Sequence, residues 1–122
     1  MELHDVALGR IIKLSDDTAE VIAAEGIEID MVMVDEYHGW VAEHLATPAF
    51  LLINRINAYS YTFEAEQAIG SLAQVRALAV IVYNRVSELT AAYMIALPRE
   101  LPWNVRVFHD REAALAWLDT QR

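Results

Sequence analysis

The chain has 122 residues, with 9 lysines and arginines against 18 aspartates and glutamates, so its formal net charge at pH 7 is −9. This negative charge argues against binding to nucleic acid or to an anionic membrane surface, and no basic patch in the sequence offsets it. The absence of cysteine excludes disulfides, thiol catalysis and thiolate zinc sites. Hydrophobic residues make up 56% of the chain, which predicts a single self-sufficient domain over residues 1–122.

The same sequence predicts a cytoplasmic protein. Its first residues include Glu2 and Asp5, where a secretory signal would have basic residues. The longest apolar run, from Ala77 to Tyr83, is far shorter than the roughly 20 residues that a membrane helix needs. We therefore expect neither a signal peptide nor a membrane span.

The first elements in chain order are expected to form a β-hairpin. Strands over Arg10–Leu14 and Ala19–Glu25 flank a turn at residues 15–18, whose serine and aspartates favour local hydrogen bonds. Gly26 then ends the second strand because glycine adopts positive φ at little cost.

From Asp30 the apolar residues recur at helical spacing. Asp30 is the expected N-cap, and Pro48 ends the helix because proline disfavours helical geometry in the residue before it. Met31, Val32 and Val34 lie off the predicted core stripe, so we expect them to form a homodimer interface. The stripe itself consists of Ile29, Met33, Tyr37, Trp40, Val41 and Leu45.

The middle of the chain contains two continuous apolar runs, Ala49–Ile53 and Ala77–Val82, which are typical of strands buried on both faces. A helix capped by Thr62 separates them, and a further helix begins at Asn84 and ends before Pro98. For the first of these helices the expected core face is Ala65, Ala68, Ile69 and Leu72, and for the second it is Val86, Leu89, Tyr93 and Leu97.

The last expected elements are a strand over Val105–Phe108 and a helix capped by Asp110, with Ala114, Leu115 and Leu118 toward the core. The resulting order is β-β-α-β-α-β-α-β-α. It predicts an α/β fold: a single-layer mixed sheet that starts with an antiparallel hairpin, continues with parallel strands and is covered by about four helices.

No motif in the sequence indicates catalysis. His38 and His44 point in different directions from one helix, so no metal site is expected. There is no glycine-rich phosphate loop and no nucleophile turn. We therefore predict a protein that is not an enzyme and that uses no cofactor.

The residues best placed for binding follow the two buried strands, because ligands collect beyond the carboxyl ends of parallel strands. They combine arginines, amides and tyrosines near two helix N-termini, where an anion is favoured. The alternative interpretation is that they are helix caps and loop packing. The candidate residues are Asn54, Arg55, Asn57, Tyr59, Ser60 and Tyr61 after the first strand, and Tyr83, Asn84 and Arg85 after the second.

The C-terminal stretch at residues 104–118, NVRVFHDREAALAWL, has a strand ending in Phe, an acidic cap and then Ala-Leu-x-Trp-Leu. Together with the strand ALAVIVYN before it, this stretch resembles the closing part of SpoIIAA-like proteins, a branch of the STAS-like group. The resemblance implies a mixed sheet of four or five strands with helices mainly on one face. Relatives in that group include anti-anti-sigma factors, which bind a kinase and are switched by serine phosphorylation, and a lipid-binding branch.

Residues 57–62 read NAYSYT, so only Ser60 matches the Asp-Ser pair of the phosphorylated relatives and the aspartate is missing. The first functional hypothesis is a non-enzymatic regulatory or protein-interaction module that acts through residues 54–62. The alternative is a module that binds a small anionic or apolar molecule or a lipid, in a cleft near Tyr59, Tyr83 and Arg85.

Overall fold

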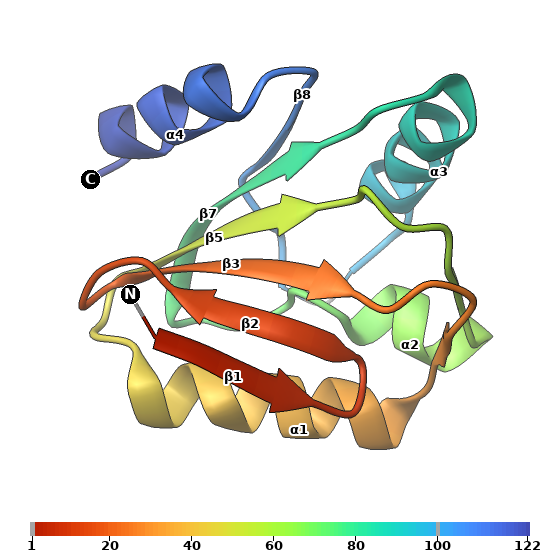
Figure 1. The fold of residues 1–122 in the computed structure, drawn as a ribbon, viewed down its shortest axis with the longest axis horizontal. Coiled ribbons are helices and arrows are strands. Elements are labelled where there is room, and N and C mark those ends of the chain that lie inside the picture. Colours follow the sequence, from red (N-terminus) through yellow and green to blue (C-terminus); the bar gives the residue numbers. More distant parts are fainter. Residues whose placement is uncertain (1, 100) are drawn as a thin grey trace.

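The computed structural model describes residues 2–99 and 101–122 and contains a six-stranded mixed sheet (Figure 1). Two further strands of two residues each, β4 (Glu28–Ile29) and β6 (Ser60–Tyr61), pair in parallel beside it. The strands of the large sheet, in spatial order, are β1 (Glu2–Val6), β2 (Gly9–Lys13), β3 (Thr18–Ala23), β5 (Ala49–Asn54), β7 (Val75–Ile81) and β8 (Val105–Phe108).

The pairing of the strands confirms the predicted mixed sheet. β1, β2 and β3 are antiparallel, and β3, β5, β7 and β8 are parallel. The sheet has six strands, where the family resemblance implies four or five. β1 was not predicted, because this edge strand is largely exposed and its sequence, ELHDV, lacks the apolar run of an inner strand.

All four predicted N-caps are confirmed, and each cap side chain accepts a hydrogen bond from a backbone N–H three residues on. Asp30 caps α1 (Met31–His44), Thr62 caps α2 (Phe63–Ala68), Asn84 caps α3 (Arg85–Ala96) and Asp110 caps α4 (Arg111–Thr120), with N–H to oxygen distances of 2.9–3.2 Å. Among the described residues, no helix is both long enough and apolar enough to cross a membrane.

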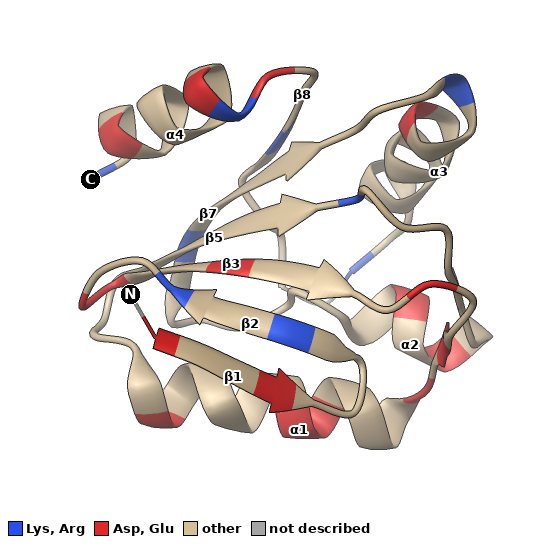
Figure 2. Cartoon of the chain, viewed as in Figure 1, with Lys and Arg blue, Asp and Glu red and all other residues tan. Residues whose placement is uncertain are grey.

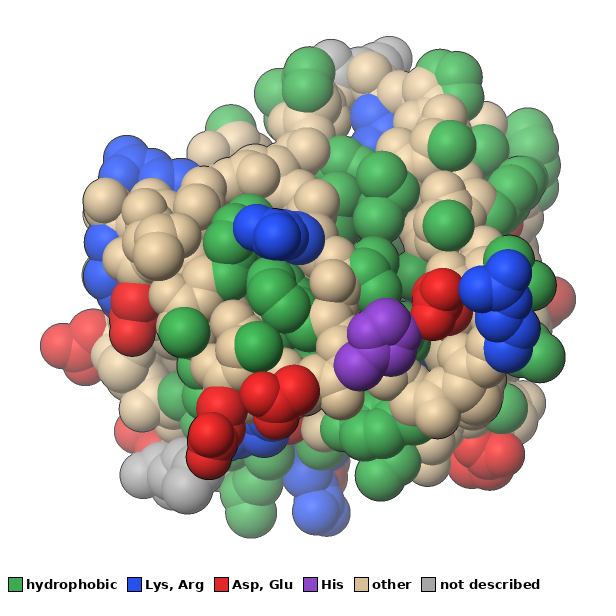
Figure 3. Space-filling model, turned by 90° about the horizontal axis from the view of Figure 1, so that it is seen from above, with side chains coloured by type: hydrophobic (Ala, Val, Ile, Leu, Met, Phe, Trp, Pro, Cys, Tyr) green, Lys and Arg blue, Asp and Glu red, His purple; other side chains and the backbone are tan. Residues whose placement is uncertain are grey.

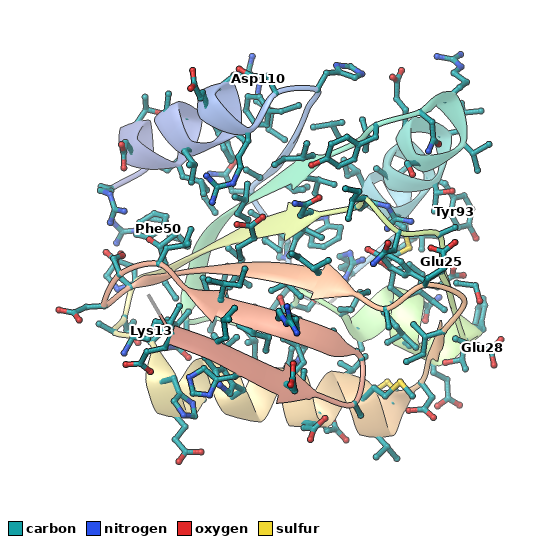
Figure 4. The ribbon with its side chains drawn as sticks, in the orientation of Figure 1. Lys13, Glu25, Glu28, Phe50, Tyr93 and Asp110 are labelled. Carbon is teal, nitrogen blue, oxygen red and sulfur yellow. The ribbon has the colours of Figure 1, made fainter. Side chains whose placement is uncertain are left out.

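The helices cover both faces of the sheet. Leu51 and Leu78 share one core cluster with α1 and α2, whereas Phe50 and Ala79 belong to a second cluster with α4 on the opposite face. In Figure 4 the labelled Phe50, on β5, lies on the side of the sheet that faces α4. α3 lies on the α1 side, where Ala91 packs against alternate residues of β7 and β8.

The predicted core face of α3 is wrong. Val86, Leu89 and Tyr93 are 74%, 54% and 54% exposed, and Leu97 is half-buried. The buried face consists instead of Ser87, Ala91 and Met94. Both sets recur at helical spacing, and the set that contains the small residues Ser87 and Ala91 is the buried one.

The predicted dimer interface is also corrected, because Val34 lies in the core and is only 1% exposed. It belongs to the buried face of α1, together with Tyr37 and Val41, at spacings of three and four residues. Met31 packs partly against the core, which leaves Val32 as the exposed member of the three. The start of α1 therefore offers much less apolar surface than the sequence indicated.

Candidate functional site

A small cavity of about 60 Å³ lies between the sheet and the helices on its α1 side. Its walls are mainly apolar and include Val21, Ile53, Leu78, Val80, Ala91 and Met94. In Figure 3 a hollow surrounded by hydrophobic side chains is visible between α3 and β8. Ile95 of α3 and Val105 of β8 also line the cavity, so this hollow lies on the side where the cavity approaches the surface.

Of the described residues that line the cavity, one, Arg55, is charged, and it is only 5% exposed. Its Nη1 donates a hydrogen bond of 2.9 Å to the hydroxyl of Tyr61. Its guanidinium carbon lies 4.5 Å from the centre of the Tyr59 ring and 5.9 Å from that of Tyr61. Among residues 2–99 and 101–122, no carboxylate forms an ion pair with this guanidinium.

Three polar atoms of cavity-lining residues are buried without a hydrogen-bond partner in the described part of the chain: Nε of Arg55, the hydroxyl of Tyr37 and Nε1 of Trp103. Burial raises the pKa of Tyr37 well above its ordinary value. Burial likewise raises the pKa of Tyr59, and the neighbouring Tyr61 raises it further, against the lowering effect of Arg55. Both hydroxyls therefore stay protonated, so that they can donate hydrogen bonds at neutral pH.

Residues 54–62, which carry Arg55 and the two tyrosines, are fixed by the segment that follows β3. The N–H of Gly26 donates to the carbonyl of Ala58 at 2.7 Å, and Nδ2 of Asn57 donates to the carbonyl of Ala23 at 2.9 Å. The pairing of β4 with β6 extends this attachment to Tyr61. Asn57 thus holds the loop in place and does not line the cavity.

The structure divides the predicted binding residues between separate places. Arg55, Tyr59 and Tyr61 come together at the cavity. Asn84 serves as the cap of α3, and Tyr83 is 49% exposed.

The remaining predicted residues also lie apart from the cavity. Arg85 is exposed on the first turn of α3 and pairs with Glu88 at 3.1 Å. Ser60 is exposed in β6, two residues before the cap of α2. A cleft was expected beside Tyr59, Tyr83 and Arg85. Of these three residues, only Tyr59 lines the cavity.

Asn54 lies on the opposite face of the sheet, because consecutive residues leaving a strand point to opposite sides. Its Nδ2 donates a hydrogen bond of 2.9 Å to Glu20 of β3, which is 4% exposed. The other carboxylate oxygen of Glu20 accepts a hydrogen bond of 2.8 Å from Arg111 at the start of α4. Sequence analysis missed this cluster, although a lone glutamate inside the apolar strand TAEVIA was a visible signal.

Tyr37 and Trp103 were also missed as cavity residues. Tyr37 was assigned to the core stripe of α1, and Trp103 belongs to no pattern in the sequence. Figure 2 shows that acidic residues are spread over strands, turns and helices. Within the described part of the chain, no group of three or more histidine, aspartate or glutamate side chains is arranged to hold a metal ion.

Comparisons with known proteins give no match: no family model fits this sequence, and neither a curated protein nor a solved structure matches it significantly. The resemblance to SpoIIAA-like proteins therefore stays a prediction. The site has to be interpreted from its own geometry.

Proposed function

We propose that this chain is a non-enzymatic binding module that holds a small, largely apolar molecule in the cavity beside Arg55. The observation that carries this proposal is an apolar cavity whose lining includes one buried cation, Arg55, without a carboxylate partner among the described residues. Buried polar groups are nearly always hydrogen-bonded, and each one left without a partner costs about 1–3 kcal/mol. A ligand whose polar group binds Arg55 and whose body is apolar matches this lining.

The size of the cavity limits the ligand. Its volume of about 60 Å³ is well below the roughly 300–1,000 Å³ of pockets that hold cofactors or drug-sized molecules. A single water needs only about 10–15 Å³ by a comparable measure. The cavity therefore suits a molecule with few non-hydrogen atoms, or a short arm of a larger one.

The chemistry of the lining supports binding over catalysis. Of the described lining residues, none is a histidine, a carboxylate, a lysine or a serine, the side chains that most often act as bases and nucleophiles. The tyrosines of the lining include two whose pKa is raised, which makes them poor bases at neutral pH. What remains is a set of hydrogen-bond donors in an apolar enclosure.

A titration followed by two-dimensional NMR tests this proposal, with isovaleramide as a small neutral probe. We expect shifts concentrated on backbone amides that border the cavity. Ile95 of α3 lines the cavity, so Ile95→Trp should fill it and abolish these shifts. Leu89→Trp, on the exposed face of the same helix, is the matched control and should leave them unchanged. Shifts that are absent, or that are unaffected by Ile95→Trp in a folded protein, would contradict the proposal.

A second candidate function, protein interaction, is favoured by the exposed apolar side chains of α3. Val86, Leu89 and Tyr93 share one face of this helix, and the hydroxyl of Tyr93 lies 3.4 Å from a carboxylate oxygen of Glu66 in α2. Phe63, one turn before Glu66, is also exposed, at 69%. Figure 4 labels Tyr93 at the outer side of α3.

Sedimentation velocity over a range of concentrations tests self-association through this face. If a second copy covers it, wild type should dimerise in the micromolar range and Leu89→Glu should be monomeric. Val32→Glu, at the start of α1, tests the interface predicted from the sequence. A dimer that this variant disrupts, and that Leu89→Glu does not, would form through α1. A wild-type protein that stays monomeric at every concentration would contradict the predicted homodimer.

A further inference from the structure

Arg55 combines deep burial with the lack of a carboxylate partner, which distinguishes it from the other arginines with described contacts. Arg111 and Arg122 pair with the carboxylates of Glu20 and Asp17. Arg99 is half-buried, but its guanidinium donates to three backbone carbonyls and one hydroxyl near the end of α2. Arg55 is the most deeply buried of these, and its contacts are one phenolic oxygen and two aromatic rings.

These contacts do not offset the burial of a full charge. A guanidinium stays protonated at any physiological pH, so it cannot avoid the cost by losing its proton. The cost of burying an ion is large, and cation–π contacts offset only part of it. The cavity beside Arg55 therefore favours an occupant that carries negative charge.

The surroundings of Arg55 select the kind of anion. One cation in an apolar enclosure balances one negative charge, so a doubly charged phosphate would leave a charge without a partner. A carboxylate matches the planar fork of the guanidinium, which can donate two parallel hydrogen bonds to it. The aromatic residues Tyr37 and Trp103 also line the cavity. Apart from the tyrosines, the rest of the wall, including Val80, Ala91 and Met94, is mainly apolar.

We infer that the ligand of this cavity is a small apolar monocarboxylate, whose carboxylate binds Arg55 and whose hydrocarbon body lies against β7 and α3. This inference rests on the function proposed above and adds the charge and chemical class of the ligand. In this inference Arg55 binds the ligand and Arg85 does not, although the sequence analysis grouped both as binding candidates.

Isothermal titration calorimetry with a matched pair of probes tests the inference on wild-type protein. Isovalerate and isovaleramide have the same shape and differ in charge, and inorganic phosphate serves as a third probe. We expect isovalerate to bind at least about tenfold more tightly than the amide, because hydrogen bonds between charged groups are stronger than neutral ones. Phosphate should not bind.

Arg55→Met should remove the preference for the acid while binding of the amide persists, and Arg85→Met is the matched control that should behave as wild type. If the acid and the amide bind equally, the carboxylate inference is overturned while the proposed function stands. If neither probe binds, the proposed function fails with it. If phosphate binds as well as isovalerate, the site is a general anion site and the inference is wrong. These three comparisons use wild-type protein, so they hold even if Arg55→Met does not fold.

Discussion

At Gly70, after α2, the backbone has a φ of +81°, a conformation that other residues adopt only with strain. A Cβ built at this position would lie 2.8 and 2.9 Å from two ring carbons of Trp103. Gly70 and Trp103 both line the cavity. The absence of a side chain at Gly70 therefore allows the indole to reach the place where it forms part of the wall.

We expect Gly70→Ala to lower the free energy of unfolding by about 2–3 kcal/mol, which combines the strain of positive φ with displacement of Trp103. Gly26→Ala is the matched control, since it has a φ of +76° with no atom within 4 Å of the new Cβ. It should cost only the strain, about 1–2 kcal/mol. Urea unfolding followed by tryptophan fluorescence measures both. Equal losses in the two variants would show that contact with Trp103 is unimportant.

The buried carboxylate of Glu20 gives a second test at the residue scale. Arg111→Met removes its cationic partner and should lower the free energy of unfolding by about 2 kcal/mol, because a buried acceptor loses a charged donor. The same substitution at Arg85 breaks only an exposed pair with Glu88 and should cost less than about 1 kcal/mol. Chemical denaturation at neutral pH compares the two. An Arg111→Met protein as stable as Arg85→Met would mean that Glu20 does not need its cation.

At the scale of elements, α3 is the informative case, because two faces of the helix have residues at helical spacing. Met94→Ala should destabilise the fold by about 2–3 kcal/mol, since Met94 is buried and lines the cavity. Leu89→Ala removes a similar volume from the exposed face and should change stability by less than about 0.5 kcal/mol. Thermal unfolding of both variants decides which face is inside. A larger loss for Leu89→Ala would restore the orientation predicted from the sequence.

Local chemistry explains which elements the sequence predicted well. The caps Asp30, Thr62, Asn84 and Asp110 act on a backbone N–H three residues away, so their role is visible in the sequence. Continuous apolar runs likewise identified β5 and β7, within one to two residues at their ends.

The rest depended on contacts between distant segments. The inward face of α3 is selected by β7 and β8, and β1 is ordered by pairing with β2. The candidate site was predicted in part, because Arg55, Tyr59 and Tyr61 were named but Asn54 was placed with them. Tyr37 and Trp103 join the site from segments far away in the sequence, and no local motif marks them.

At the scale of the whole molecule, Arg122, which follows α4, is bonded to the turn between β2 and β3 and to the first residue of β3. Arg122 donates hydrogen bonds to Asp17 and to Thr18, and its guanidinium carbon lies 4.7 Å from the centre of the Phe50 ring. Burial opposes ionisation of Asp17, but hydrogen bonds from Thr18, Arg122 and Ser15 outweigh it and lower its pKa. This carboxylate therefore links the segment after α4 to the turn before β3.

A lowered pKa in the folded state means that Asp17 contributes stability above its unfolded pKa of about 4 and that this contribution is lost as the pH falls through the folded value. We expect the urea concentration at the midpoint of unfolding to decrease once the pH is lowered below about 4. Asp17→Asn should reduce that fall and lower the midpoint at pH 6, and Asp16→Asn is the neighbouring control. An Asp17→Asn protein with an unchanged pH profile would show that this contact does not contribute.

The central claim is that the guanidinium of Arg55 binds a ligand carboxylate inside the cavity. The most direct measurement is the ¹⁵Nε–¹Hε resonance of Arg55 during a titration with isovalerate, assigned by its absence in Arg55→Lys. Nε has no hydrogen-bond partner in the described part of the chain. The account predicts a saturable downfield shift of this proton with isovalerate and a much smaller one with isovaleramide. An Arg55 resonance that stays in place while isovalerate binds would contradict it.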